Sequence, residues 1–378
     1  MNNKYFIAAL LISVACTQVT NKKTSANKEI EAIEFPVADT LILLFGGDAM
    51  QHLPQINSAR TDAGYDYTSC LAPVKNIISQ ADISIINFET TLGDKPYTGY
   101  PQFSSPDEFA KALKECGFDI FLTANNHCLD RYTQGAQRTL NQLDSLSITH
   151  IGTYRNSVER QHNYPMIKTV NNIHIAFLNY TYGTNGISPQ APFVVNLIDT
   201  LLIKQDINSA RNKGAELLIA CMHWGDEYHR YPNKNQKILA NWLEKNGVQL
   251  IIGSHPHVVQ PIELHTDSAG SAQSLVAYSL GNFVSNMQKR YCDGGIMLKV
   301  KICKEHEQIR IISAGYILHF TRRPAHGAGP GYEILPLTHI TEKKDSIPQH
   351  LWTSISRFVS DTRSLMEQYS FGVKEITN

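Results

Sequence analysis

Side chains that bind divalent metals recur in this sequence directly after short apolar runs. Carboxylates, imidazoles and asparagine amide oxygens are ligands of hard and borderline metals. Five of six successive runs are followed by such residues, namely Asp48 and His52, Asn87 and Glu89, Asn126, His127 and Asp130, His223, and His255 and His257. One such residue alone indicates little, because a lone buried histidine is more often a core residue with its hydrogen bonds satisfied. Their recurrence at the same end of successive runs predicts one site.

This set of residues predicts a site for one or two divalent metal ions. Buried without a metal, so many polar groups would be costly. Two metals bridged by a carboxylate polarise an oxygen and bring the pKa of bound water near neutrality. A nearby histidine that binds no metal can act as general acid to the leaving oxygen. The combination fits hydrolysis of a phosphate ester and, less well, of an amide. Mn, Zn, Fe and Mg remain open as the metal.

The apolar runs themselves have the length and β-branched content of buried strands. They are Thr40–Phe45, Ile83–Ile86, Phe118–Thr123, His174–Asn179, Glu216–Cys221, Val248–Ile252 and Ser274–Ser279. The run that ends at Asn179 is the one without a candidate ligand behind it. Open α/β sheets bind ligands beyond the carboxyl ends of their strands, which is where the polar residues fall.

Segments of helical periodicity separate these runs. Their expected spans are a helix capped by Ser105-Pro106-Asp107-Glu108, and helices over Thr133–Leu146, Asp199–Lys213 and Pro232–Asn246. Capping residues at the starts and glycines after the ends support them. Alternation of strands and helices predicts a layered α/β domain with a largely parallel sheet. From Gly294 the pattern changes to two consecutive antiparallel strands, and an amphipathic helix is expected over about Leu351–Tyr369.

The order of the short motifs resembles a known family. The series GD…NFET…TANNH…HWG…GSHPHVVQP…YSLGNF, from about Leu41 to Gly295, is similar to the bacterial capsule-synthesis CapA family, also called the poly-γ-glutamate capsule (PGA-cap) family. The fold of that family is similar to calcineurin-like metallophosphoesterases. The resemblance therefore implies a layered metallophosphoesterase-like α/β sandwich with an antiparallel C-terminal portion. It would span residues 39–340 and be followed by a helical tail over 341–378.

The resemblance also implies roles for individual residues. Those expected to bind metal are Asp48, His52, Glu89, Asn126, His223, His255 and His257. Among them, His52 is separated from Asp48 by more residues than in the Asp-x-His motif of phosphoesterases. Glu89 stands where phosphoesterases have a bridging Asp, so the number of bound ions, one or two, stays open. His127 would be the catalytic histidine that binds no metal, and Asp130 would orient it.

The first residues indicate an export signal rather than a part of the folded domain. Residues 1–15 have one lysine and a short apolar stretch typical of a signal peptide, too short to span a bilayer. Ser13-Val14-Ala15-Cys16 resembles a bacterial lipobox, so that Cys16 would be acylated, and residues 16–38 would form a flexible tether. The alternative is a plain secretory signal with an incidental cysteine. Either way we expect the cell envelope, and in the first case a lipid anchor to a membrane.

The charge balance and the absence of one motif limit the classes of partner that we expect. The 378 residues carry 34 basic and 34 acidic side chains, and this balance argues against nucleic acid. The expected substrate is a phosphoester or an anionic polymer. The sequence has no phosphate-binding Gly-x-x-x-x-Gly-Lys motif and would depend on a capsule-synthesis membrane complex to make polymer. A non-catalytic or amide-processing component of such an assembly or export complex is the alternative to a phosphoesterase-type hydrolase.

Overall fold

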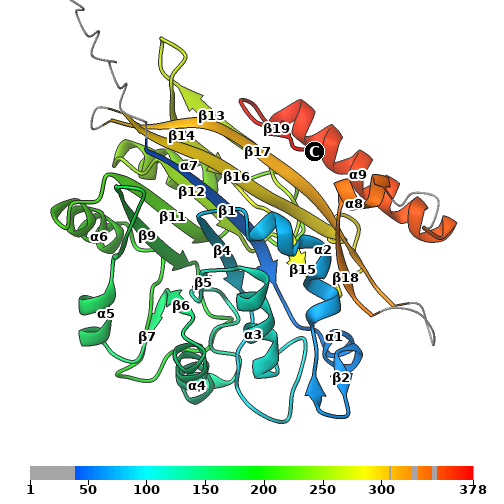
Figure 1. Cartoon of the computed structure of the whole chain (residues 1–378). Coiled ribbons are helices and arrows are strands. Elements are labelled where there is room, and N and C mark those ends of the chain that lie inside the picture. Colours follow the sequence, from blue (N-terminus) through cyan, green and yellow to red (C-terminus); the bar gives the residue numbers. More distant parts are fainter. Residues whose placement is uncertain (1–38, 306–307, 325–330, 343–346, 378) are drawn as a thin grey trace, which may run out of the picture. The chain divides into compact units, whose positions relative to one another are not determined.

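The computed structural model describes residues 39–305, 308–324, 331–342 and 347–377, and the signal peptide, Cys16 and the tether lie outside them. Two large sheets dominate the described residues (Figure 1). The first has nine strands in the order β18-β17-β16-β1-β4-β5-β6, with β15 paired to β1 and β19 to β17. The second has six strands in the order β13-β14-β12-β11-β9-β8.

The first sheet is parallel on one side and antiparallel on the other. Its parallel strands are β1 (Asp39–Ala49), β4 (Ile83–Phe88), β5 (Ile120–Leu122) and β6 (Thr149–Ile151), with β15 (Asn282–Val284) beside the end of β1. The antiparallel strands are β16 (Gly294–Glu305), β17 (Gln308–Arg322) and β18 (Glu333–Pro336). The short strand β19 (Lys374–Glu375) runs parallel to β17. The antiparallel C-terminal portion predicted from the sequence is therefore confirmed.

The second sheet has a parallel centre and antiparallel edges. Its central strands are β9 (Ile173–Thr181), β11 (Leu217–His223), β12 (Leu250–Ser254) and β14 (Ala272–Ala277). The edges are β8 (Met166–Val170) and β13 (Ile262–Thr266). Two small ribbons complete the strands, β2 (Arg60–Thr61) with β3 (Gly64–Tyr65) and β7 (Thr153–Tyr154) with β10 (Val194–Val195).

Nine helices lie within the described residues. They are α1 (Leu53–Ser58), α2 (Thr68–Ile78), α3 (Asp107–Cys116), α4 (Tyr132–Ser145), α5 (Ser157–Asn163), α6 (Thr200–Asn212), α7 (Lys234–Lys245), α8 (Leu337–Glu342) and α9 (Gln349–Tyr369). The four predicted internal helices form, with ends shifted by one or two residues. For example, the N-cap residue of α3 is Pro106, where Ser105 was expected. No helix in this described part is long and apolar enough to cross a membrane.

Alternating strand residues build a layered sandwich. Inward-facing residues of the first sheet, such as Phe45, share one buried cluster with residues of the second, such as Phe177 and Ile219. Leu44, the residue before Phe45 in β1, faces the opposite side and packs in a different cluster with residues of α2 and α3. Helices α6 and α7 cover the outer face of the second sheet in the same way. The predicted α/β sandwich is confirmed.

The C-terminal residues belong to the same compact unit as the sandwich. Helix α9 buries Ile355, Phe358 and Leu365 in the cluster that the two sheets share. The Phe358 ring lies 6.0 Å from that of Phe320 on β17. One compact unit runs from Ala38 to Asn378, so the helix expected as a tail is part of the core.

Candidate metal centre

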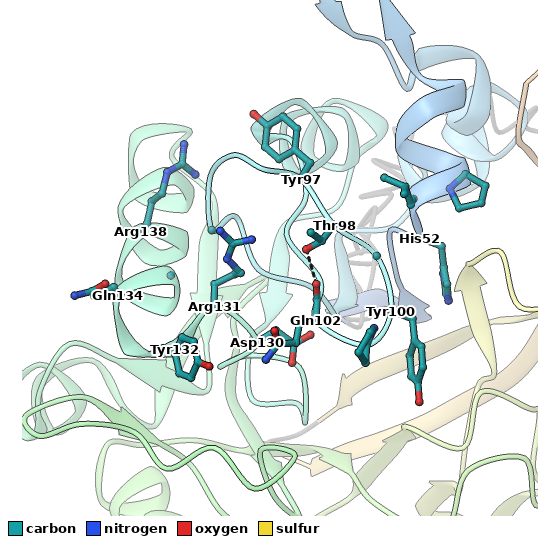
Figure 2. Close-up of a pocket in the computed structure, with 16 residues that line it drawn as sticks. His52, Tyr97, Thr98, Tyr100, Gln102, Asp130, Arg131, Tyr132, Gln134 and Arg138 are labelled. Atoms are coloured by element: carbon teal, nitrogen blue, oxygen red, sulfur yellow. Dashed lines mark hydrogen bonds between the residues drawn. The ribbon is translucent and has the colours of Figure 1, made fainter.

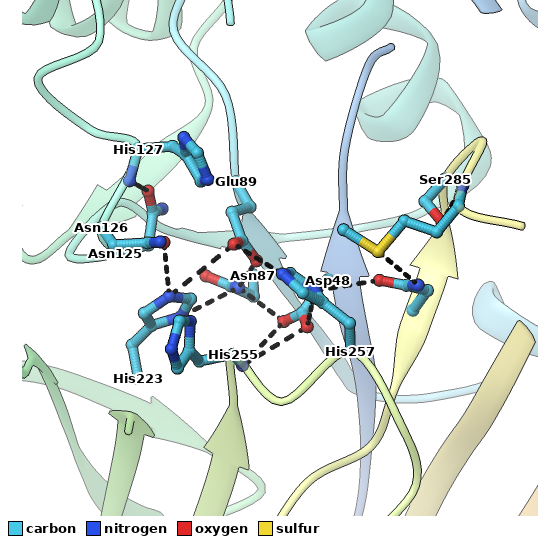
Figure 3. Close-up of polar contacts among 12 residues, drawn as sticks. Asp48, Asn87, Glu89, Asn125, Asn126, His127, His223, His255, His257 and Ser285 are labelled. Atoms are coloured by element: carbon cyan, nitrogen blue, oxygen red, sulfur yellow. Dashed lines mark hydrogen bonds and ion pairs between the residues drawn. The ribbon is translucent and has the colours of Figure 1, made fainter. Parts of the chain in front are cut away.

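The carboxyl ends of strands from both sheets converge on one buried polar cluster (Figure 3). Asp48 lies near the end of β1, Glu89 directly follows β4, His223 ends β11 and His255 directly follows β12. Parallel pairing places Asp48 opposite Asn87 in one sheet, and His223 opposite Ser254 in the other. Strand register therefore brings together side chains that are far apart in the sequence.

Two groups of potential metal ligands share one carboxylate. The first is Glu89, His255 and His257, and the second is Asp48, Glu89 and His223; within each group the ligand atoms lie within 4.8 Å of one another. The Oε1 atom of Glu89 is 3.7 Å from Nε2 of His223 and 3.7 Å from Nε2 of His257. Glu89 therefore occupies the position expected of a bridging carboxylate.

Two buried atoms of this polar cluster have no hydrogen-bond partner among the described residues, which indicates that the cluster can hold a cation. Among the described residues, Oε1 of Glu89 and Nδ1 of His255 are buried and have no hydrogen-bond partner. Burying a carboxylate oxygen without a partner is costly, and a divalent ion would offset that cost. The nitrogen and oxygen donors of this set suit Zn, Mn, Fe or Mg, and the residues present fit one or two ions.

The electrostatics of the cluster agree with this fit. Burial, and next the Asp48 carboxylate, raise the pKa of Glu89 well above its usual value. Burial and neighbouring histidines hold the pKa of His223 well below its usual value, and burial with His257 lowers the pKa of His255 to about 3. Both imidazoles are therefore neutral at physiological pH, which is the form that binds metal.

Asp48 and His257 orient one another. Nδ1 of His257 lies 3.0 Å from Oδ2 of Asp48, and the buried carboxylate accepts this hydrogen bond. Burial tends to raise the pKa of Asp48, but hydrogen bonds from His257 and Asn87 hold it below its usual value. Because Nδ1 makes this contact, Nε2 of His257 faces Glu89. Carboxylates commonly fix the tautomer of metal-binding histidines in this way.

The turn after β12 has an unusual backbone. His255 and His257 both have positive φ angles, of 100° and 58°. Such angles are uncommon for residues with a side chain and concentrate at functional sites. The turn places both imidazoles among the ligand atoms around Glu89.

Asn87 holds the two carboxylates side by side. Its amide nitrogen donates to Oδ1 of Asp48 at 2.8 Å and to Oε2 of Glu89 at 3.0 Å. These bonds satisfy one oxygen of each carboxylate and leave Oε1 of Glu89 without a donor. Asn87 thus positions the acids.

The two residues predicted as a catalytic pair, His127 and Asp130, are hydrogen-bonded to each other. Nδ1 of His127 donates to Oδ2 of Asp130 over 2.7 Å, and both side chains are buried. Asp130 also accepts the backbone N–H of Phe103, whose ring packs edge-on against His127 at 4.7 Å. Burial raises the pKa of Asp130, and the bond from His127 offsets part of that effect. Asn126 lies next to this pair, and its Oδ1 accepts from Nε2 of His223 at 2.8 Å.

His52 belongs to neither of the two ligand groups, so its role as a metal ligand stays a prediction, and the structure gives this side chain other contacts. The chain turns into α1 just after β1, and His52 is the residue before that helix. Its backbone N–H donates to Oε1 of Gln55 at 2.8 Å, and its ring Nδ1 lies 3.3 Å from the backbone nitrogen of Asn286. Capping of α1 therefore engages this histidine, which lies outside both ligand groups.

The loop after β9 adds two residues that the sequence did not indicate. The ring of Tyr182 lies 4.6 Å from that of His255, and Oδ1 of Asn185 accepts from the amide of Asn126 at 3.2 Å. No candidate ligand follows the run that ends at Asn179, but the loop after it returns to the metal centre. A tyrosine and an asparagine beyond a strand are common in loops, so only the loop conformation identifies these two.

Comparison with known proteins gives the family. Residues 42–287 match the family model described as bacterial capsule synthesis protein PGA_cap. The chain belongs to this family. The family resemblance expected from the motifs is confirmed.

Two curated relatives carry related names. The capsule biosynthesis protein CapA of Bacillus anthracis is 26 % identical over 296 residues, which cover 75 % of this chain and 69 % of the relative. The PGA biosynthesis protein CapA of Bacillus subtilis is 28 % identical over 271 residues, which cover 65 % and 63 %. This PGA_cap protein thus matches about two thirds of the length of each relative.

Solved structures resemble it more loosely. The NAD nucleotidase of Haemophilus influenzae superposes with a TM-score of 0.47 at 12 % identity, over 90 % of this chain and 65 % of that one. A 5'-nucleotidase from Candida albicans gives a TM-score of 0.41 at 13 % identity, over 73 % and 51 %. With TM-scores below 0.5, these likenesses carry no weight for function.

Replacing Glu89 by glutamine tests the shared ligand. We expect Glu89→Gln to stabilise the metal-free protein near pH 7.5. The pKa of the buried Glu89 carboxyl is raised in the folded protein, so ionised Glu89 lowers the free energy of unfolding at any pH above the pKa that this group has in the unfolded chain. The gain should vanish below about pH 4. Metal at a hundredfold excess over its Kd should stabilise the wild type by about 2.7 kcal/mol, and stabilise Glu89→Gln far less.

The measurement is thermal and urea unfolding with EDTA and with Mn²⁺ or Zn²⁺. Glu115→Gln, at an exposed position of α3, is the matched control and should behave as the wild type. Full metal-dependent stabilisation of Glu89→Gln would show that Glu89 is no ligand.

Proposed function

We propose that this PGA_cap protein is a metal-dependent hydrolase of the phosphoesterase type that acts in capsule or poly-γ-glutamate biosynthesis. The observation that carries the proposal is the pairing of two different parts. One is the pair of ligand groups sharing Glu89. The other is His127, which lies outside both groups and is held by Asp130. A site that bound metal only for stability would not need this second part.

The residues of the site would have different roles in such a reaction. The proposed metal ligands are Asp48, Glu89, Asn126, His223, His255 and His257. One or two ions held there would polarise a substrate oxygen and activate water. In the protonated form His127 donates from Nε2 to the leaving oxygen, while Asp130 accepts from Nδ1 and stabilises the imidazolium. Burial of both side chains keeps this hydrogen bond out of water.

His127→Ala tests the hydrolase directly. Removing a general acid costs about 10²–10⁴ in rate, so we expect turnover of the best substrate to fall at least a hundredfold while the bound metal is retained. The assay uses the full chain in detergent with Mn²⁺ or Zn²⁺, against phosphomonoesters, phosphodiesters and γ-glutamyl polymer.

The matched control is His162→Ala, at an exposed histidine of α5, which should keep full activity. The proposal is wrong if the wild type holds less than one equivalent of metal and His127→Ala leaves every activity unchanged.

A second candidate function is favoured by the names of the relatives. Both are capsule or PGA biosynthesis proteins, and a γ-glutamyl polymer contains amide bonds rather than phosphate esters. The same centre would then process an amide, or serve an assembly or export complex without catalysis. Shortening of polymer in the assay above, with no phosphate ester cleaved, would favour amide processing.

We also propose that the protein is anchored in the bacterial cell envelope through an acylated Cys16. The support is the sequence around that residue, Ser13-Val14-Ala15-Cys16, behind a short apolar stretch. A lipid on the mature N-terminus would hold the domain at a membrane through residues 16–38.

Cys16→Ser should abolish incorporation of an alkyne-labelled fatty acid and release the protein from the membrane fraction. The readouts are in-gel fluorescence and fractionation of cells. Ser25→Ala, in the same tether, serves as the control and should keep the label. Undiminished labelling of Cys16→Ser would contradict the anchor, and wild-type protein that is secreted without label would indicate a plain signal peptide.

A further inference from the structure

An open cleft and a buried strand border the metal centre. The cleft has a volume of about 900 Å³ and is lined by the loop over residues 93–102, by His52 with the start of α1, and by Asp130 with the first turns of α4 (Figure 2). Its lining mixes aromatic, amide and charged side chains, which does not single out one class of ligand. The buried strand is β15, and its first residue, Asn282, contacts the proposed ligand His257.

Two glycines bring β15 against the end of β1. Asp48 of β1 pairs in parallel with Asn282, and the backbone N–H of Asp48 donates to the carbonyl oxygen of Gly281 at 3.0 Å. A Cβ atom at Gly47 would lie 2.0 Å from that oxygen, and Gly281 has a φ of 72°. Glycine meets both conditions without strain. The close approach places Asn282, which is fully buried, beside Asp48.

The side-chain amide of Asn282 has a defined orientation. Its Nδ2 donates to the backbone oxygen of Cys292 at 3.1 Å and to Sδ of Met287 at 3.6 Å. The Oδ1 atom therefore faces the other way and lies 3.2 Å from Nδ1 of His257. Because an amide oxygen only accepts hydrogen bonds, Nδ1 of His257 carries the proton. The lone pair of this imidazole is then on Nε2, which lies 3.7 Å from Oε1 of Glu89.

The N–H group at Nδ1 of His257 has two acceptors. Oδ2 of Asp48 lies 3.0 Å away and Oδ1 of Asn282 lies 3.2 Å away. Asp48 and His257 belong to different ligand groups, so the hydrogen bond between them joins the two groups, whereas Asn282 belongs to neither. An ion in each group would place a cation on both partners of that bond. A carboxylate that shares its charge with a metal ion is a weaker acceptor, so the N–H group then needs its second acceptor.

We propose that Asn282 is a positioning residue that lets both ligand groups hold an ion at the same time. When Asp48 binds metal, Oδ1 of Asn282 accepts the hydrogen bond from Nδ1 of His257 and keeps Nε2 directed at Glu89. Outer hydrogen-bond partners of this kind fix the tautomer and the ring orientation of metal-binding histidines. The inference rests on the metal ligands of the proposed function and specifies a centre for two ions.

Metal titration without substrate tests this proposal. The full chain, freed of metal and kept in detergent, is titrated with Mn²⁺ or Zn²⁺ in a calorimeter, and we expect two binding steps for the wild type. Loss of an outer hydrogen-bond partner lowers metal affinity about 10–100-fold. Asn282→Leu should therefore raise the Kd of the second step about thirtyfold and change that of the first less than about threefold. Met287→Leu, which removes the sulfur beside the same amide, is the control and should leave both steps unchanged.

Asn282→Asp separates the acceptor from the packing of this side chain. It keeps an oxygen that can accept from His257 and gives up the amide donor to Cys292, so it should retain the second step. Loss of the second step in both Asn282→Asp and Asn282→Leu would indicate a role in packing and contradict the proposal. Wild-type Kd values for Asn282→Leu, or a wild type that saturates with one ion, would overturn it.

Crystals of the wild type at full metal occupancy decide the question should Asn282→Leu fail to fold. Nδ1 of His257 should then lie nearer to Oδ1 of Asn282 than to either oxygen of Asp48, and the opposite order with both ions bound overturns the proposal. A wild type that binds no metal would contradict the proposed function as well. Failure confined to the Asn282 variants would leave that function intact.

Discussion

The Glu89 carboxylate is the constraint on which the rest of the site depends. It is buried between His223 and His257, and Asp48 nearby makes its charge still more costly. Asn87 satisfies one of its oxygens, but Oε1 has no donor among the described residues. A cation shared by the surrounding ligands would offset this cost most directly. Two sheets whose strand ends meet are what deliver these ligands to one carboxylate.

Much of this arrangement could be predicted from the sequence, because a parallel strand buried on both faces is a plain apolar run. The residues at the ends of such runs, Asp48, Glu89 and His223, could therefore be assigned to one site, although they come from two sheets. The position of His52 before α1 could not be predicted, because a helix of six residues leaves little trace in the periodicity of the sequence. Tyr182 and Asn185 depend on a loop conformation that no spacing encodes.

The cleft beside the centre could not be predicted at all. The residues that line it come from the loop between β4 and α3, from the start of α1 and from the first turns of α4, which are far apart in the sequence. Tertiary contact of this kind has no sequence signature. Because the 34 basic and 34 acidic side chains balance, an anionic substrate would be attracted by bound metal rather than by the electrostatic field of the whole protein.

The most direct test of the account is anomalous diffraction from crystals grown with Zn²⁺ or Mn²⁺ and measured at the absorption edge of the metal. The account predicts a peak about 2.0–2.2 Å from Glu89, with His255 and His257, or Asp48 and His223, completing its coordination. Two peaks on either side of Glu89 would correspond to two ions and one peak to a single ion. An ion bound elsewhere, or none near Glu89 at saturating metal, would contradict the account.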